Sequence, residues 1–318
     1  MSKCTNSALR TQMGYKYPMP SSSSHHSLRT NGPFWLTLSA IAFAVMAVLV
    51  RMASQVGLPG SETTTIRFAF GLLTILLLSS LGKAEIKVRR FPVLALRGIV
   101  GGIGILFYFI SLAAAHGNNA VPLTDSVFLG NSYFIYIPIF AALMIHERPC
   151  SGIIVMAVVA LIGLYLITGA ELRHIKTGDI YGFLAGITNA ISLIFVRELR
   201  KTETTASIFA SLCLFGMLVA ALMMAFEGFM MPNPVGWWLL AGIGVASVIG
   251  QLAMTHSLRY TPTGQAGVIN MTTVIYSSAA GIIWFGDPFN LRILLGAILV
   301  LGSGTLISLI HGHWIECE

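Results

Sequence analysis

The sequence predicts an all-α integral membrane protein with ten transmembrane helices in two inverted five-helix repeats. Three observations lead to this prediction: an apolar composition, ten segments long enough to cross a bilayer, and an uneven distribution of basic residues. Of the 318 residues, 55% are hydrophobic and 10% are charged. Soluble domains carry about 25% charged residues, so a soluble enzyme is excluded. The apolar surplus runs from Phe34 to Ile310, which excludes a single anchor.

The ten segments are identified by the length of their apolar runs. A helix that crosses a bilayer needs about 20 mostly apolar residues, whereas a barrel strand needs about ten residues of alternating polarity. Proline and glycine mark the breaks between segments, as at Pro149, Pro262 and Pro288. The predicted helices are 33–53, 62–82, 92–115, 122–146, 152–170, 177–197, 205–226, 236–257, 263–285 and 291–311.

Both ends of the chain lie outside the apolar segments. Residues 1–32 carry a run of serines before His25 and His26, and we expect a disordered cytoplasmic tail without the apolar core of a signal peptide. Residues 312–318 form a second cytoplasmic tail. The histidine pair is expected to be solvated rather than bound to a metal. None of the four cysteines has a metal-binding spacing, so neither a metal nor a cofactor is expected.

Basic residues predict the orientation. With the N-terminus inside the cell, 14 Lys and Arg residues fall in the inner loops and tail, four fall outside, and Arg67 lies within a span. This split agrees with the positive-inside rule and predicts both termini on the cytoplasmic side of the inner membrane. It also accounts for the net charge of +7. The expected partners are therefore the lipid bilayer and a small-molecule substrate, without nucleic acid.

The two halves show a weak internal similarity. Gly163 and Gly302 are separated by 139 residues, as are Asn131 and Asn270. This offset predicts a first repeat at 33–170 and a second at 177–311. Because five helices is an odd number, the second repeat enters the membrane from the opposite side. Inverted repeats of this kind are typical of secondary transporters.

Four stretches resemble a known family. They are Leu38–Met46 with Arg51, Ile66-Arg67-Phe68, Leu96-Arg97-Gly98 followed by Phe107-Tyr108, and Val121–Asp125 continuing to Glu147-Arg148. They are similar to the EamA family of the drug/metabolite transporter superfamily, and the last resembles its S-adenosylmethionine-carrier-like branch. The resemblance covers residues 33–311. It implies ten helices in two five-helix halves, and transport of a metabolite.

Charges within the spans are the strongest candidates for a substrate pathway. Arg67 lies near the outer end of its helix and Arg97 near the inner end of the next. A charge inside a membrane usually faces a cavity or a partner; the alternative is that each side chain extends to the lipid headgroups. Asp125 opens the fourth span, where it either enters the pathway or stabilises the positive end of the helix. Ser132 and Tyr136 share its helix face.

Uncharged polar residues extend the candidate pathway. Asn131 and Asn270 occupy matching repeat positions, where they either line the pathway or join helices by hydrogen bonds. The remaining candidates are Tyr108, Asn189 and Gln251; packing at an interface is the alternative for the tyrosine.

The predicted function is secondary transport of a small polar or zwitterionic metabolite, of amino-acid or nucleoside type, by alternating access. The sequence has no GxxxxGK[ST] phosphate loop, so we do not expect ATP to drive transport. The energy would come from a coupling ion or from substrate exchange, or the protein would be a facilitator. One alternative is a receptor or structural protein, which would not require polar groups within the spans of both halves. The other is an intramembrane enzyme. The enzyme motifs HExxH and GxSxG are absent, so we expect no catalysis.

Overall fold

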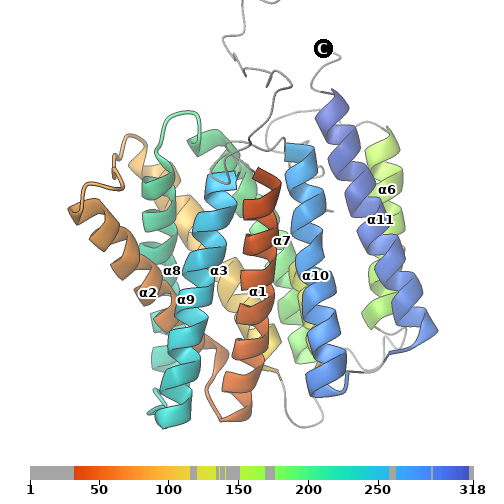
Figure 1. The fold of residues 1–318 in the computed structure, drawn as a ribbon, viewed down its shortest axis with the longest axis horizontal. Helices are drawn as coiled ribbons and strands as arrows, with labels where there is room; N and C mark the ends of the chain where they lie inside the picture. The colour runs from red at the N-terminus through yellow and green to blue at the C-terminus, as the bar shows by residue number, and fades with distance from the viewer. Residues whose placement is uncertain are drawn as a thin grey trace, which may run out of the picture.

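The computed structural model describes residues 32–114, 120–133, 136, 140, 151–168, 176–257, 263–287 and 289–314. These residues form ten helices and no strand, which confirms the predicted all-helical class (Figure 1). The helices are α1 (Gly32–Gln55), α2 (Gly60–Ser80), α3 (Phe91–Ala113), α4 (Leu123–Gly130), α6 (Ser151–Thr168), α7 (Thr177–Leu199), α8 (Thr205–Glu227), α9 (Pro234–Ser257), α10 (Thr263–Phe285) and α11 (Leu291–Trp314).

The outside of the bundle is apolar. Large side chains such as Leu77, Phe226 and Trp238 are exposed, as expected where lipid replaces water as the solvent. Within the described residues, six helices are long and apolar enough to cross a membrane, and the apolar stretches 272–285 and 291–303 are shorter. The protein is therefore a multi-pass membrane protein, while ten spans remain a prediction.

The predicted span 122–146 is interrupted. Helix α4 ends at Gly130, and Asn131 and Ser132 form a turn. The side chains of these two residues bond back to carbonyl groups of the preceding turn: the Asn131 amide donates to Val127 at 2.9 Å and the Ser132 hydroxyl donates to Leu129 at 2.6 Å. Such local hydrogen bonds compete with continuation of a helix. The single long helix predicted here was therefore wrong at Asn131.

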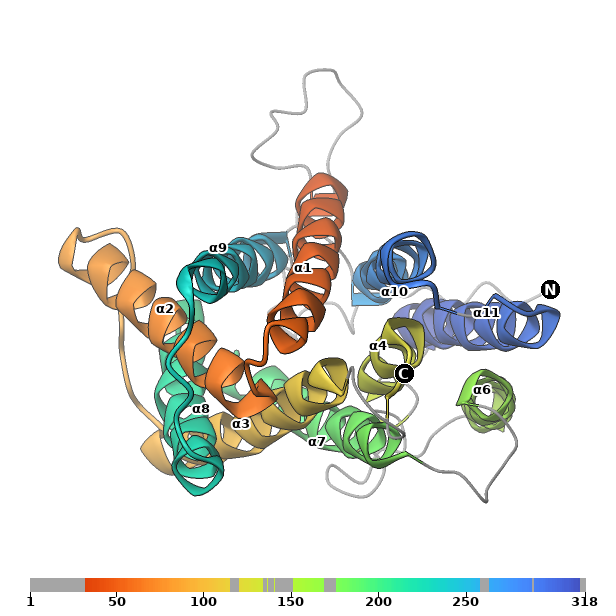
Figure 2. The same cartoon turned by 90° about the horizontal axis from the view of Figure 1, so that it is seen from below.

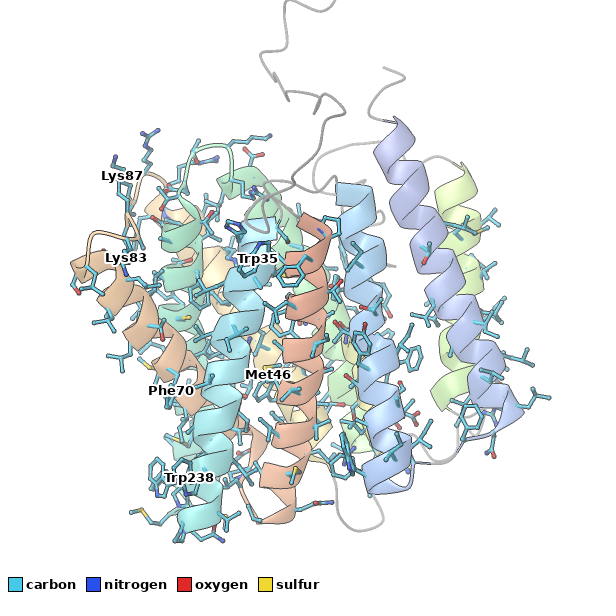
Figure 3. All side chains as sticks on the ribbon, in the orientation of Figure 1. Trp35, Met46, Phe70, Lys83, Lys87 and Trp238 are labelled. Atoms are coloured by element: carbon cyan, nitrogen blue, oxygen red, sulfur yellow. The ribbon has the colours of Figure 1, made fainter. Side chains whose placement is uncertain are left out.

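Basic residues of the loops gather at one end of the bundle. Helix α1 begins and α11 ends at the same end, where Lys83 and Lys87 also lie, whereas Trp238 lies at the other (Figures 1 and 3). We call the first the basic end; its exposed or half-buried loops contain Lys83, Lys87, Arg89, Arg90, Arg200 and Lys201. Five acidic residues are found at the opposite end, namely Glu62, Asp125, Asp179, Glu227 and Asp287, whereas Glu85, Glu198 and Glu203 lie at the basic end.

Helices far apart in the sequence pack together. Helix α3 packs along α7, α1 along α9, α2 along α8 and α6 along α11. Viewed along the bundle, α2 and α8 lie at one edge and α6 and α11 at the other (Figure 2). The two halves of the chain are thus interleaved throughout the bundle.

Glycines allow the closest of these contacts. A Cβ atom on Gly102 of α3 would lie 2.4 Å from the Cα of Gly216 on α8, and one on Gly98 would lie 2.5 Å from the carbonyl oxygen of Ser211. These distances are shorter than a van der Waals contact, so only glycine fits. The small-residue pattern therefore serves close helix packing.

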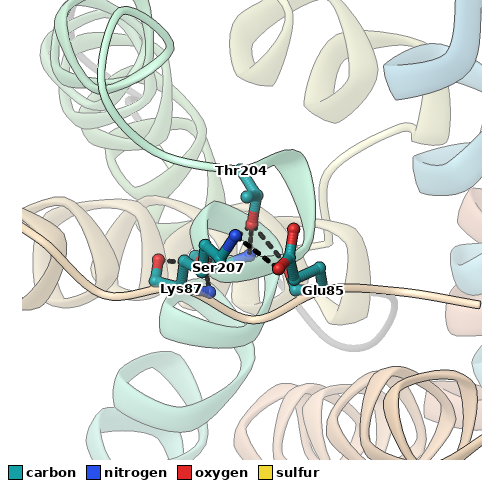
Figure 4. Close-up of polar contacts among 4 residues, drawn as sticks. All are labelled: Glu85, Lys87, Thr204 and Ser207. Atoms are coloured by element: carbon teal, nitrogen blue, oxygen red, sulfur yellow. Dashed lines mark hydrogen bonds and ion pairs between the residues drawn. The ribbon is translucent and has the colours of Figure 1, made fainter. Parts of the chain in front are cut away.

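A carboxylate joins two loops at the basic end. Glu203, which precedes α8, accepts the backbone N–H groups of Arg89 at 2.9 Å and Arg90 at 2.6 Å in the α2–α3 loop. Beside it, the Ser207 hydroxyl donates to the Lys87 carbonyl and accepts the Lys87 N–H (Figure 4). We call this set the basic-end clasp.

A comparable contact occurs at the opposite end. Glu62, in the first turn of α2, accepts the backbone N–H of Met230 in the α8–α9 loop at 3.2 Å. The neighbouring Ser61 hydroxyl donates to the carboxylate of Glu227. In both clasps, a carboxylate at the start of α2 or α8 holds the loop that leaves the other helix.

Candidate functional site

Arg67 points into the bundle. It is 6% exposed, and its Nε donates a hydrogen bond to the Ser247 hydroxyl of α9. Its guanidinium carbon lies 5.4 Å from the ring centre of Phe68 and 5.2 Å from that of Phe109 on α3. Such cation–π contacts stabilise a desolvated guanidinium. The side chain therefore connects α2, α3 and α9 and does not extend to the membrane surface.

Tyr108 and Asn131 lie next to Arg67. The Tyr108 hydroxyl lies close to the Asn131 side chain and to Arg67. The ring of Tyr108 covers Gly130, where a Cβ atom would lie 2.2 Å from the ring. The turn that ends α4 thus places the side-chain amide of Asn131 next to α3. We call Arg67, Tyr108, Phe109, Asn131 and Ser247 the Arg67 cluster.

The polar face predicted on the fourth span packs against α7. A Cβ atom on Gly186 of α7 would lie 2.5 Å from the Ser132 hydroxyl and 3.1 Å from the Tyr136 ring. Tyr136 also contacts Phe183, with their ring centres 5.9 Å apart. Ser132 and Tyr136 do share one side of the chain, and this side forms a helix interface, apart from the Arg67 cluster.

Asp125 is buried at the opposite end, in the first turn of α4, where Asp287 supplies a capping hydrogen bond. The N–H and hydroxyl of Thr124 both donate to Asp287 Oδ2 at 2.8 Å, so a residue two positions after the end of α10 supplies the cap. Asp125 itself is 9% exposed, and its Oδ1 has no hydrogen-bond partner in the described part of the chain.

Cations near Asp125 have other hydrogen-bond partners. Arg51 donates to the carbonyl groups of Ala114 and Val121, and the Lys176 ammonium donates to that of Ala120. Both lie near Asp125, as do Asp179 and Asp287, but no ion pair joins either cation to it in the described residues. Asp125 is therefore a buried carboxylate with one oxygen available.

The remaining candidates lie on other helices. Arg97 is 7% exposed among α3, α7 and α8. The Asn189 side chain of α7 faces Gly104 of α3, where a Cβ atom would lie 2.5 Å from its oxygen. Gln251 is half-buried on α9. Asn270 lies on α10, and its side chain falls outside the described residues.

Sequence reasoning missed the partners of these residues. Ser247, Ser192 and Cys213 are small residues within apolar helices, and nothing in their spacing distinguishes them from packing residues. Asp287 lies between α10 and α11, as the sequence predicted, but its hydrogen bond to Thr124 of α4 was not foreseen. The one feature of the sequence that could have indicated this contact is the position of Asp287, two residues after the end of a predicted helix and next to Pro288.

The apolar exterior and the charged groups in the interior define a multi-pass membrane protein with a polar site inside its helix bundle. The chain belongs to the EamA-like transporter family, whose pattern matches residues 30–169 and again residues 176–309. This confirms the resemblance found in the sequence. Membership of this family points to membrane transport of a small molecule.

Several proteins are similar along most of their length. The pseudopaline exporter CntI of Pseudomonas aeruginosa is 26% identical over 282 residues, which cover 88% of this chain and 96% of the exporter. An uncharacterized transporter of Helicobacter pylori is 24% identical over 290 residues, covering 87% and 94% of the two chains. A crystal structure with 17% sequence identity matches 92% of this chain and all of its own, with a TM-score of 0.57; this match concerns the fold alone.

Proposed function

We propose that the protein is a secondary transporter that exports a small polar metabolite by alternating access, and that the Arg67 cluster contacts an anionic group of this metabolite. The observation that carries the proposal is the buried Arg67 guanidinium, which has no carboxylate partner among the described residues. A buried charge is costly unless it is paired, and a substrate anion supplies such a partner. The name of the Pseudomonas relative supports export as the direction.

The packing of the helices supports an inverted repeat. If α1–α6 correspond in order to α7–α11, exchange of the two halves converts the α3–α7 contact into the α9–α1 contact. The same exchange maps the α2–α8, α4–α10 and α6–α11 contacts onto themselves, and all these contacts occur. Two family matches in one chain agree with this pattern. Rocking of such halves about a central site is the usual basis of alternating access.

Replacement of Arg67 by alanine should reduce transport by roughly 10- to 100-fold, because a hydrogen bond to a charged group contributes about 1.5–3 kcal/mol. An untargeted comparison of metabolites in a deletion strain and its parent, in cells and medium, identifies the compound to measure. Its flux is then measured in proteoliposomes. Arg67→Lys should restore transport only in part, since lysine lacks the planar fork of arginine.

Arg292 provides the matched control for this experiment. It is an exposed arginine in the first turn of α11, and Arg292→Ala should transport normally. Normal flux through Arg67→Ala, with equal amounts of protein in the membrane, would contradict the proposed role of the cluster.

The basic end is proposed to face the cytoplasm, because inner loops are enriched in lysine and arginine. Reporter fusions test this orientation. A fusion after residue 174 should report the outside of the inner membrane, and one after residue 318 should report the inside. If both fusions report the same side, the ten-span inverted topology is wrong.

A further inference from the structure

Arg97 is a buried arginine, and two of its three guanidinium nitrogens lack hydrogen-bond partners in the described residues. Its side chain is only 7% exposed, and neither Nε nor Nη1 has a hydrogen-bond partner in the described residues. No carboxylate forms an ion pair with it in that part of the chain. Its burial also removes the alternative that the side chain extends to the lipid headgroups.

Its surroundings contain donors instead of acids. A Cβ atom on Gly101 would lie 2.7 Å from Arg97 Nη1 and 2.6 Å from the Ser192 hydroxyl of α7. The guanidinium and the hydroxyl therefore face the same bare stretch of α3. The Cys213 thiol of α8 lies near both Arg97 and Arg67.

Arg51 shows how this protein satisfies a buried arginine that has a structural role. Its Nη1 and Nη2 donate to the carbonyl groups of Ala114 and Val121. Arg97 has no such contacts through Nε and Nη1 within the described residues. An isolated cation in a medium of low dielectric constant is costly, and an added anion with suitable acceptors reduces that cost.

We propose that Arg97 and Ser192 form a binding site for an oxyanion, namely a carboxylate of the transported molecule. This site lies on the basic-end side of the Arg67 cluster, so the same anionic group contacts Arg97 and Arg67 in turn as it crosses the membrane. The inference rests on the proposed transport function and adds a substrate class: molecules that carry a carboxylate.

The test measures binding to the purified full-length protein in detergent. Thermal unfolding is followed by tryptophan fluorescence in sodium succinate, sodium phosphate or sodium chloride at equal ionic strength. Succinate should raise the melting temperature of the wild type by several degrees, because a ligand that binds only the folded state stabilises it. A shift with phosphate alone identifies a free inorganic anion as the ligand and overturns the assignment to a substrate carboxylate.

The variants locate the effect. Arg97→Gln should lose the succinate shift, and should melt above the wild type without anion, because it removes an unpaired charge. Arg51→Gln is the matched control: it should melt below the wild type and keep the succinate shift. A full shift in Arg97→Gln, an equal shift with chloride, or no shift in the wild type would each overturn the proposal. This experiment measures binding and not transport. A failure of the anion-site proposal can therefore be told apart from a failure of the transport proposal.

Discussion

Replacing Gly102 with leucine should leave little folded protein in the membrane. Helices α3 and α8 cross at this point, and even the Cβ atom of alanine would lie 2.4 Å from the Cα of Gly216. The atom in the way belongs to the backbone, so no side-chain rotation relieves the overlap. Alanine should lower the free energy of unfolding by about 1–3 kcal/mol, the usual cost of overpacking, and leucine by more.

Gly302 is the matched control because it also lies within a helix, but a Cβ atom added to it would meet no other atom of the described residues within 4 Å. Gly302→Ala should be neutral or slightly stabilising, since alanine favours helix more than glycine does. The measurement is the amount of monodisperse protein in size-exclusion chromatography, together with the melting temperature. Equal yields of Gly102→Leu and the wild type would show that α3 and α8 do not pack as described.

Replacing Asp125 with asparagine should abolish gradient-driven accumulation while substrate exchange persists. Our proposal is that Asp125 binds the coupling proton, since its buried Oδ1 lacks a hydrogen-bond partner among the described residues. Asparagine keeps the size of the side chain but cannot bind a proton at this position. Since Asp287 caps α4, the loss of function should not follow from loss of the cap. Both activities are measured in proteoliposomes with and without a proton gradient.

The other outcomes of this experiment have different meanings. If accumulation and exchange weaken together, Asp125 contacts a cationic part of the substrate; unchanged accumulation removes any role in transport. Asp287→Asn is the control at the same end of the bundle. It perturbs the hydrogen bonds to Thr124 and should lower stability without changing the ratio of accumulation to exchange.

Hydropathy was sufficient to predict where most helices lie. Nine of the ten described helices begin and end within a few residues of the predicted segments, because apolar length and flanking turn residues determine these limits. Helix α4 differs because its break depends on hydrogen bonds from Asn131 and Ser132 to their own backbone. Hydropathy does not detect those bonds, since both residues lie within a continuous apolar segment.

The site could be predicted only in part. Arg67, Arg97 and Asp125 stand out because charge is rare within spans, and the structure buries all three. Their partners depend on which helices meet. Arg67 reaches Ser247 across 180 positions of the sequence, and Asp287 reaches Thr124 across 163, which no local pattern specifies. For the same reason, the contact of Ser132 and Tyr136 with Gly186 of α7 was not foreseen.

The basic-end clasp and the comparable contact of Glu62 affect which substitutions the loops can tolerate. Glu203 and Glu62 hold their loops through backbone N–H groups, which every amino acid except proline possesses. The side chains at residues 89, 90 and 230 are therefore free to change without loss of these bonds, and proline is the one residue incompatible with them. Mutational tolerance at these positions should accordingly depend on the carboxylate across the contact, and relatives with divergent loops can retain the same attachment.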